Sequence, residues 1–278
     1  NSMASPAMVR KMILAGNKYV GGYVRPYEFL NYYRVSYAPA DPGHVRVVPQ
    51  LRAGEKEGEL RLQIGIQAPA PQVRRPMNLA FVLDTSGSMG GGGRIDRERA
   101  AMKAILSQLQ SGDIVSIATW NTSQQVLFDG HVASGPDDPA LVAAMAKLVP
   151  DGGTDLSSGI NKGFAMAQKN YAKERMNRVV MITDGEANVS ETDGKVIGAA
   201  SHTADGEGIY LVGVNVGDPG GDPLMNQVTD LGRGASVFLD TEAEATRMFT
   251  ERFDETMEVA ARGVRLELTI PWYLSLQS

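Results

Sequence analysis

Cysteine is absent from the 278-residue sequence. Disulfide bonds, zinc–thiolate sites and thiol catalysis are therefore excluded, while the compartment stays open because a cysteine-free chain suits the cytosol and the bacterial periplasm equally. Basic residues do not dominate either, since 27 lysines and arginines stand against 32 aspartates and glutamates, a net charge of -5. This balance gives no indication of a nucleic-acid or anionic-lipid partner. No apolar run approaches the roughly 18 residues that a membrane helix needs, so we predict no transmembrane segment.

Histidine is scarce as well, and its three occurrences, His44, His131 and His202, are scattered along the chain. None neighbours an acidic motif, so a surface or core role is expected for each rather than a place in a catalytic or metal-binding cluster. The glycine run Gly90–Gly93 follows a predicted strand, but the Lys-Ser/Thr pair of a phosphate-binding loop does not come after it. Without cysteine and with few histidines, a functional site in this chain is expected to use oxygen-bearing side chains.

The first forty residues contain six of the nine tyrosines, which are Tyr19, Tyr23, Tyr27, Tyr32, Tyr33 and Tyr37. Two short helix-like pieces lie in the same segment, and each is opened by a proline, Pro6 or Pro26. An aromatic cluster of this kind more often packs against a neighbouring domain than binds a ligand. We therefore expect an N-terminal helical segment that packs against another part of the molecule.

Apolar and polar residues alternate in 59–67 and again in 264–270, the pattern of a half-buried strand. A shorter strand is predicted around 45–51, and the proline-rich stretch 68–76 is typical of a linker. We predict that the two alternating strands belong to one small partial β-sandwich into which a larger domain is inserted. The predicted division is 1–76 for the helical segment and first strands, 77–261 for the inserted domain, and 262–278 for the return strand, after which the chain is expected to be truncated.

The inserted domain has a different pattern. Amphipathic helical stretches separate five nearly continuous apolar runs, which are Leu79–Leu83, Ile114–Ala118, Val179–Ile182, Ile209–Val214 and Val237–Leu239. Strands without alternation that are separated by helices indicate a parallel sheet buried on both faces. A short antiparallel edge strand is predicted at Gln125–Phe128. The predicted fold class is therefore α/β, with a doubly wound, mostly parallel sheet.

The first of these strands runs into Asp84-Thr85-Ser86-Gly87-Ser88, a D-x-S-x-S motif at its carboxyl end. In open parallel sheets, ligands bind in the crevice outside these ends. One carboxylate and two hydroxyls are hard oxygen ligands, which suit Mg²⁺, Mn²⁺ or Ca²⁺. Two further elements stand at similar junctions: a tight turn before a helix offers the Thr154 hydroxyl, and another buried strand ends in Asp184. The sequence thus predicts an oxygen-rich site at one end of the sheet.

D-x-S-x-S, the distant threonine and the distant T-D-G aspartate resemble the metal-ion-dependent adhesion site of von Willebrand factor type A domains, and the resemblance spans about residues 77 to 261. It implies a Rossmann-like sheet order and a complete site for one divalent cation, with Mg²⁺ as first choice and Mn²⁺ or Ca²⁺ as alternatives. The implied metal-site residues are Asp84, Ser86, Ser88, Thr154 and Asp184. In the family the serines and threonine commonly coordinate the metal, and one or both aspartates act directly or through water. A sixth position is left to an acidic side chain of the partner.

The resemblance also implies the function of a divalent-metal-dependent protein-binding or adhesion module, not an enzyme. The segment 24–33 is similar to that of bacterial secreted or lipid-anchored members, so an extracytoplasmic location is expected, with a cytoplasmic one as the alternative. Two other functions stay open: an assembly factor that docks on an ATPase machine through the same site, and a metal-dependent hydrolase, for which the sequence offers no evident general base. Glu186 and Asn188 either line the partner-binding rim or merely solvate their loop. Asp155 is expected to cap a helix rather than bind metal.

Overall fold

Two compact units make up the computed structural model, which describes residues 2–18, 24–69, 73–185, 191–203, 206–219, 227, 229–259 and 264–276. Unit 1 comprises Asn1–Arg34 and Val73–Glu258, and unit 2 comprises Val35–Gln72 and Val259–Ser278. The contacts therefore group the first 34 residues with the α/β fold rather than with the strands that follow them. Within the described part of the chain, no helix is both long and apolar enough to cross a membrane.

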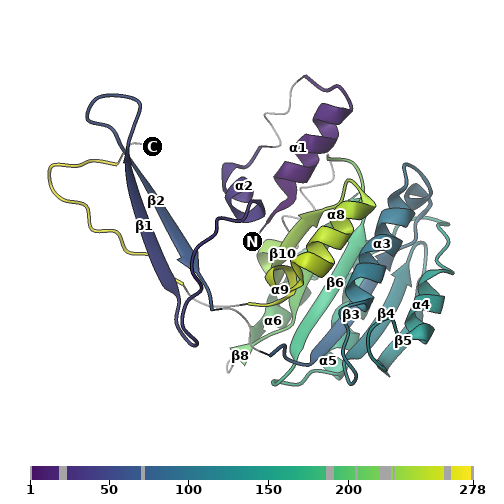
Figure 1. The fold of residues 1–278 in the computed structure, drawn as a ribbon. Helices are drawn as coiled ribbons and strands as arrows, with labels where there is room; N and C mark the ends of the chain where they lie inside the picture. Colours follow the sequence, from purple (N-terminus) through teal and green to yellow (C-terminus); the bar gives the residue numbers. More distant parts are fainter. Residues whose placement is uncertain are drawn as a thin grey trace. The chain divides into compact units, whose positions relative to one another are not determined.

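A six-stranded sheet forms the centre of unit 1, with the strand order β10-β9-β6-β3-β4-β5 (Figure 1). Its strands are β3 (Met77–Asp84), β4 (Ile114–Trp120), β5 (Gln124–Val132), β6 (Met176–Thr183), β9 (Tyr210–Asn215) and β10 (Arg233–Phe238). All neighbouring pairs are parallel except β4 and β5, which are antiparallel. The predicted fold class and the antiparallel edge strand are thus confirmed. Every residue of β3 and β6 is buried, as their continuous apolar runs predict.

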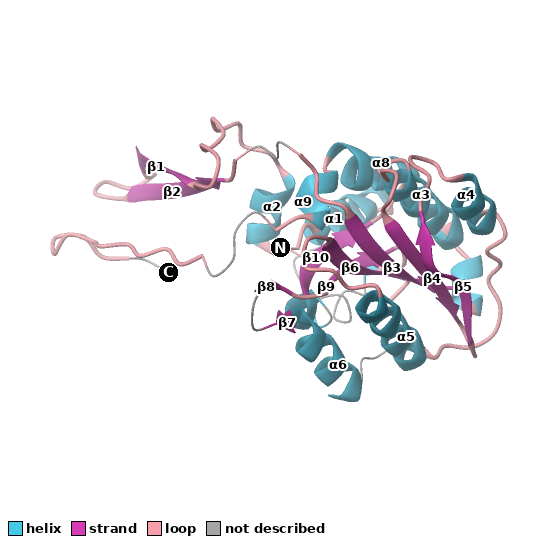
Figure 2. Ribbon diagram, turned by 90° about the horizontal axis from the view of Figure 1, so that it is seen from below, coloured by secondary structure: helices cyan, strands magenta, loops and turns pink. Residues whose placement is uncertain are grey.

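Helices cover both faces of this sheet (Figure 2). One face carries α3 (Arg94–Leu106), α4 (Pro139–Met145), α8 (Glu242–Thr246) and α9 (Phe253–Met257), and the other carries α5 (Leu156–Lys169) and α6 (Glu191–Ser201). Successive side chains of a strand point to opposite faces, so Phe81 of β3 packs into the core under α3 and α4, whereas Val82 packs into the core under α5. Short elements complete the unit: η2 (Gly87–Gly90), β7 (His202–Thr203), β8 (Gly206–Glu207) and η4 (Arg247–Glu251).

The N-terminal segment consists of α1 (Ala4–Leu14) and α2 (Pro26–Tyr32) and is attached to the same unit. The backbone N–H of Met3 donates to the Ser236 carbonyl of β10 at 2.9 Å, and Ala4, Ala7 and Met8 form a buried cluster with Phe238. Tyr32 is buried, whereas Tyr27 and Tyr33 are exposed. Tyr19 and Tyr23 lie outside the described residues. Of the described tyrosines of the cluster, Tyr32 is thus buried as expected, and Tyr37 is half-buried.

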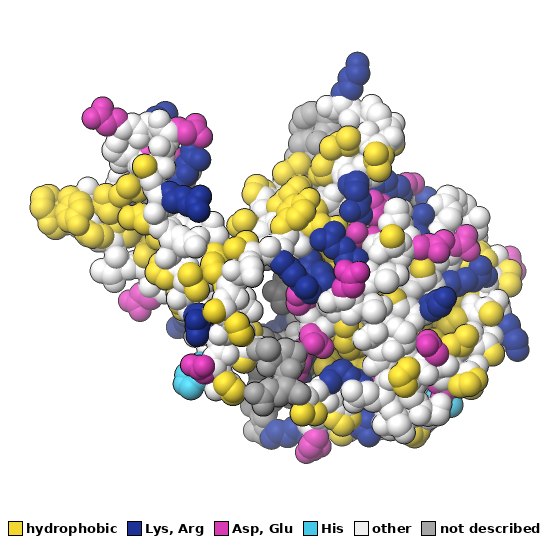
Figure 3. All heavy atoms as spheres, viewed as in Figure 1, with side chains coloured by type: hydrophobic (Ala, Val, Ile, Leu, Met, Phe, Trp, Pro, Cys, Tyr) yellow, Lys and Arg dark blue, Asp and Glu magenta, His cyan; other side chains and the backbone are white. Residues whose placement is uncertain are grey.

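Unit 2 contains an antiparallel hairpin of β1 (Arg46–Ala53) and β2 (Leu60–Gln67), close to the two predicted strands. Residues 264–276 contain a turn but no strand, so the return strand predicted at 264–270 is not formed in this structure. Three of its four apolar side chains are exposed, from 46% at Leu268 to 55% at Val264, because the segment has no strand partner that would bury them. Exposed hydrophobic side chains are visible on this unit in Figure 3.

Candidate metal centre

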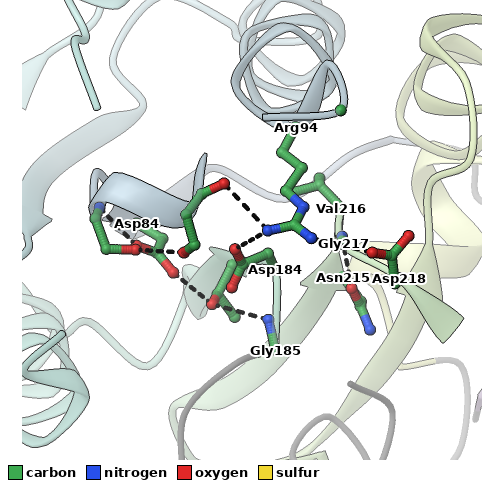
Figure 4. Close-up of polar contacts among 12 residues, drawn as sticks. Asp84, Arg94, Asp184, Gly185, Asn215, Val216, Gly217 and Asp218 are labelled. Carbon is green, nitrogen blue, oxygen red and sulfur yellow. Dashed lines mark hydrogen bonds and ion pairs between the residues drawn. The ribbon is translucent and has the colours of Figure 1, made fainter. Parts of the chain in front are cut away.

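The candidate site lies where the two central strands end. β3 and β6 are neighbours in the sheet, with Leu83 opposite Ile182, so Asp84 and Thr183 finish their strands side by side. Asp184 follows β6 directly, and the short helix η2 follows β3 (Figure 4). The structure thus brings the two predicted aspartates to one edge of the sheet, as the parallel arrangement requires.

The D-x-S-x-S loop folds its oxygens around one point. The backbone N–H and the hydroxyl of Ser86 both donate to Oδ1 of Asp84, at 2.9 and 2.6 Å. The Oγ atoms of Ser86 and Ser88 lie 3.0 Å apart. Asp84 and Ser86 are almost fully buried, with exposures of 1% and 2%. Three of the five predicted ligands therefore converge.

Thr183 is a site residue that the sequence reasoning missed. Its hydroxyl donates to Oδ2 of Asp84 at 2.6 Å, while the backbone N–H of Gly185 donates to the Thr183 hydroxyl at 3.2 Å. Gly185 adopts a positive φ of 81°, a conformation that favours glycine. The T-D-G motif contains this signal, because Thr183 directly precedes the aspartate at the end of the strand.

The loop that carries Thr154 is tied to the D-x-S-x-S loop by its backbone. Gly87 N–H donates to the Gly152 carbonyl at 3.1 Å, and Asp151 N–H donates to the Thr85 carbonyl at 2.8 Å. Thr154 itself is exposed, and within the described residues its hydroxyl makes no hydrogen bond to the other four predicted ligands. The structure thus places the loop of Thr154 at the site but does not bring its hydroxyl into contact with the rest.

The structure tests the prediction for Asp155 but not the prediction for the rim residues. Asp155 precedes α5, and its carboxylate accepts a hydrogen bond from Ser158 N–H at 3.2 Å, which confirms its capping role. Glu186 and Asn188 lie outside the described residues. Their place at the partner-binding rim stays a prediction.

A cation of the protein itself lies against Asp184. Nη1 of Arg94 is 2.9 Å from Oδ2 of Asp184 and donates to the Ser88 carbonyl at 3.1 Å. Nη2 of the same guanidinium is 3.0 Å from Oδ2 of Asp218 (Figure 4). Arg94 begins α3 directly after a turn of glycines. Sequence reasoning could not identify this contact, because 90 residues separate Arg94 from Asp184.

Burial and charge shift the pKa of two carboxyl groups here. Burial raises the pKa of Asp84, hydrogen bonds from Ser86 and Thr183 partly offset this, and the nearby charge of Asp184 adds to the rise. Glu98 of α3 is fully buried, and burial, followed by the negative charge of Asp84, raises its pKa well above the ordinary value. The end of the sheet therefore disfavours additional negative charge and favours a bound cation.

The residues present fit a hard divalent cation. Among the described residues, no group of three or more His, Cys, Asp or Glu side chains could hold a metal ion, so a site here depends on hydroxyl oxygens as well as carboxylates. Asp84, Ser86 and Ser88 supply such a set, and Asp184 adds a second carboxylate. Oxygen donors of this kind suit Mg²⁺, Mn²⁺ or Ca²⁺.

The sequence that forms this end of the sheet matches a known protein family. Residues 79–186 match the model of the von Willebrand factor type A domain, a range that begins in β3 and reaches just past Asp184. The chain contains a von Willebrand factor type A domain. All five predicted ligands of this domain, from Asp84 to Asp184, lie within the matched range.

Curated relatives share the domain but are much longer. The chain is 26% identical over 192 residues to the uncharacterized protein YfbK of Escherichia coli (strain K12), covering 69% of this chain and 33% of that protein. It is 24% identical over 198 residues to inter-alpha-trypsin inhibitor heavy chain H3 of Homo sapiens, covering 69% of this chain and 22% of that protein. The chain thus spans about a third or less of the length of these relatives.

A solved structure supports the fold. A von Willebrand factor type A protein from Catenulispora acidiphila is 16% identical with a TM-score of 0.53, covering 77% of this chain and 50% of that chain. Its sequence is too distant to transfer a function. The similarity supports the α/β fold of the domain.

Proposed function

We propose that this von Willebrand factor type A domain is a divalent-metal-dependent protein-binding module whose metal accepts an acidic side chain of the partner. The observation that carries the proposal is the convergence of Asp84, Ser86 and Ser88 at the carboxyl end of β3, beside Asp184 at the end of β6. Homologous domains in longer proteins support a role in protein–protein interaction.

The charge of the site explains why the partner group should be acidic. Asp84, Ser86, Ser88, Thr154 and Asp184 would hold the cation, with two carboxylates nearly balancing its charge. Hydroxyls and water are neutral ligands, so a bound divalent ion keeps the ability to accept one more carboxylate. An acidic protein with a net charge of -5 can thereby bind an acidic group of its partner.

The first test is calorimetry on chelator-treated protein titrated with Mg²⁺, Mn²⁺ or Ca²⁺. We expect one saturable site for at least one of these ions, and no binding in Asp84→Ala. Asp96→Ala is the matched control, because it removes an exposed carboxylate of α3 and should leave metal affinity unchanged. Absence of saturable heat for all three ions would reject the proposed metal site.

The second test examines the partner chemistry. A library of random peptides is selected for binding to the immobilised protein in the presence of the metal that binds. Retained peptides should carry an aspartate or glutamate that is essential for binding, and they should be released by chelator. Some peptides could stay bound after chelation and after their acidic residue is changed to the amide. That result would place recognition elsewhere on the domain.

We extend the proposal to an extracytoplasmic location, on the basis of the sequence similarity of segment 24–33 to secreted or lipid-anchored bacterial members. Fractionation of cells that express the natural full-length protein tests this. Recovery in the cytosolic fraction would favour the alternative of an intracellular assembly factor.

A further inference from the structure

Four charged side chains of alternating sign form a row that starts at the metal centre. Arg94 lies 2.9 Å from Asp184 on one side and 3.0 Å from Asp218 on the other. Asp218 in turn lies 2.9 Å from Nζ of Lys11 on α1. The row thus connects the predicted ligand Asp184 with the N-terminal segment.

The inner end of the row is buried and the outer end is accessible. The side chain of Asp184 is 2% exposed, that of Arg94 is 15% exposed and that of Asp218 is 69% exposed. An ion pair between buried groups is screened little by salt, so the contact between Arg94 and Asp184 is the strong one. Figure 4 shows the guanidinium between the two carboxylates.

Asp218 is held in place from the far side. Lys11 donates to Asp218 and also to the Gly217 carbonyl at 2.7 Å. The hydrogen bond from Lys11 is the main cause that lowers the pKa of Asp218, and Arg94 contributes as well. The carboxylate of Asp218 is therefore charged and lies beside Arg94, outside the metal site.

We propose that Arg94 is an intramolecular cation that competes with the divalent metal for Asp184, and that Asp218 tunes this competition as the alternative acceptor for the guanidinium. The inference rests on the proposed metal-dependent function. A divalent ion needs the charge of Asp184, and two cations cannot share one carboxylate at close range without repelling each other. Metal binding therefore requires that Arg94 give up Asp184, and Asp218 retains the guanidinium when it does.

The test measures the metal affinity of chelator-treated variants at about 0.15 M salt, where the Debye length is about 8 Å and remote charges are screened. Arg94→Gln should bind the metal about tenfold more tightly, because a hydrogen bond between charged groups is lost from the competing state. Arg94→Lys retains the charge and should stay closer to the wild type. Lys103→Gln removes an exposed charge of the same helix and should have no effect.

Asp218→Asn examines the second half of the proposal. It should weaken metal binding severalfold, because the guanidinium of Arg94 then loses a charged acceptor outside the metal site and is held more firmly at Asp184. In the Arg94→Gln background the same change should have a much smaller effect, since no guanidinium is left to redirect. Equal effects of Asp218→Asn in both backgrounds would show simple long-range attraction and would overturn this half.

Thermal unfolding separates competition from a merely structural role. Arg94→Gln should lower the midpoint in chelator, where Asp184 loses its counter-ion, but not in saturating metal. An equal loss in both conditions would make Arg94 a structural residue and would overturn the proposal. Equal metal affinity of wild type and Arg94→Gln would overturn it while leaving the proposed function intact. Absence of metal binding in both proteins would overturn both.

Discussion

Thr183 donates its hydroxyl hydrogen to Oδ2 of Asp84 at 2.6 Å and so joins the ends of the two central strands. Oδ1 of the same carboxylate accepts hydrogen bonds from Ser86. Both oxygens of a buried carboxylate therefore have donors, and its orientation is fixed by the fold itself. The central ligand of the proposed metal site is thus positioned by a residue of the neighbouring strand.

Replacing Thr183 by valine should weaken both the fold and the site. The change keeps the shape of the side chain but leaves one oxygen of Asp84 without its donor, which costs about 1–3 kcal/mol. For a domain of this size, each kcal/mol lowers the thermal midpoint by roughly 2–4 °C. Metal affinity, measured by calorimetry, should fall because the carboxylate is free to rotate. Thr183→Ser retains the hydroxyl and should restore both properties; a valine variant with wild-type stability and affinity would contradict the role assigned to Thr183.

Local patterns predicted the framework of the fold and part of the site. Continuous apolar runs identified β3 and β6 as buried parallel strands, and the chemistry of the D-x-S-x-S loop is contained in five consecutive residues. The contact of Thr183 with Asp84 depends on which strands are neighbours, a property that hydropathy does not contain. The same holds for Arg94 and Asp184, whose pairing requires the helix and the strand end to be placed first.

The limits of pattern reasoning are clearest outside the sheet. Alternation predicted a strand at 264–270, but alternation describes a segment that needs a partner and does not supply one. Composition showed that tyrosines gather near the N-terminus, yet it could not distinguish buried Tyr32 from its exposed neighbour Tyr33. That difference arises from hydrogen bonds of the Tyr32 hydroxyl to Glu244 and Arg247, residues more than two hundred positions away.

Glu98→Gln should stabilise the metal-free domain at neutral pH. Burial, and then the charge of Asp84, raises the pKa of Glu98 in the folded state well above its ordinary value. The folded protein therefore binds a proton that the unfolded chain loses near pH 4.3, and stability falls as pH rises from there towards the folded pKa. The amide avoids this loss, so the thermal midpoint in chelator should be higher than that of the wild type at pH 7.5 and similar at pH 4. A glutamine variant that is less stable at pH 7.5 would show that the charged carboxylate is needed.

Asp138→Asn should have the opposite pH dependence. Burial alone would raise the pKa of Asp138, but hydrogen bonds from Ser134, His131 and the first turn of α4 hold that pKa below its ordinary value. Its contribution to stability is therefore present above the unfolded pKa of about 3.9 and is lost as pH falls below it. Asparagine can still cap the helix, so the variant should be less stable by about 1 kcal/mol at pH 7, and the difference should narrow towards pH 3. Urea unfolding at several pH values measures this, and a difference independent of pH would assign the effect to packing.

Tyr32→Phe should loosen the N-terminal segment from the domain. The Tyr32 hydroxyl accepts from Arg247 at 2.7 Å and from Arg10 at 3.2 Å, and it donates to Glu244 at 3.1 Å. Phenylalanine keeps the ring beneath the Arg247 guanidinium but removes the hydroxyl that links the buried Glu244 carboxylate to two half-buried arginines, at a cost of about 1–3 kcal/mol. The thermal midpoint should fall by roughly 2–4 °C for each kcal/mol, and limited proteolysis should cut sooner within residues 1–34.

The matched control is Tyr33→Phe, which removes a hydroxyl from a neighbouring tyrosine that is 56% exposed. A surface change of this kind should alter stability by no more than about 0.5 kcal/mol. If Tyr32→Phe behaved like this control, the buried network between α2 and α8 would contribute nothing to folding. A selective effect of Tyr32→Phe would instead show that the first 34 residues are part of the fold that carries the proposed metal site.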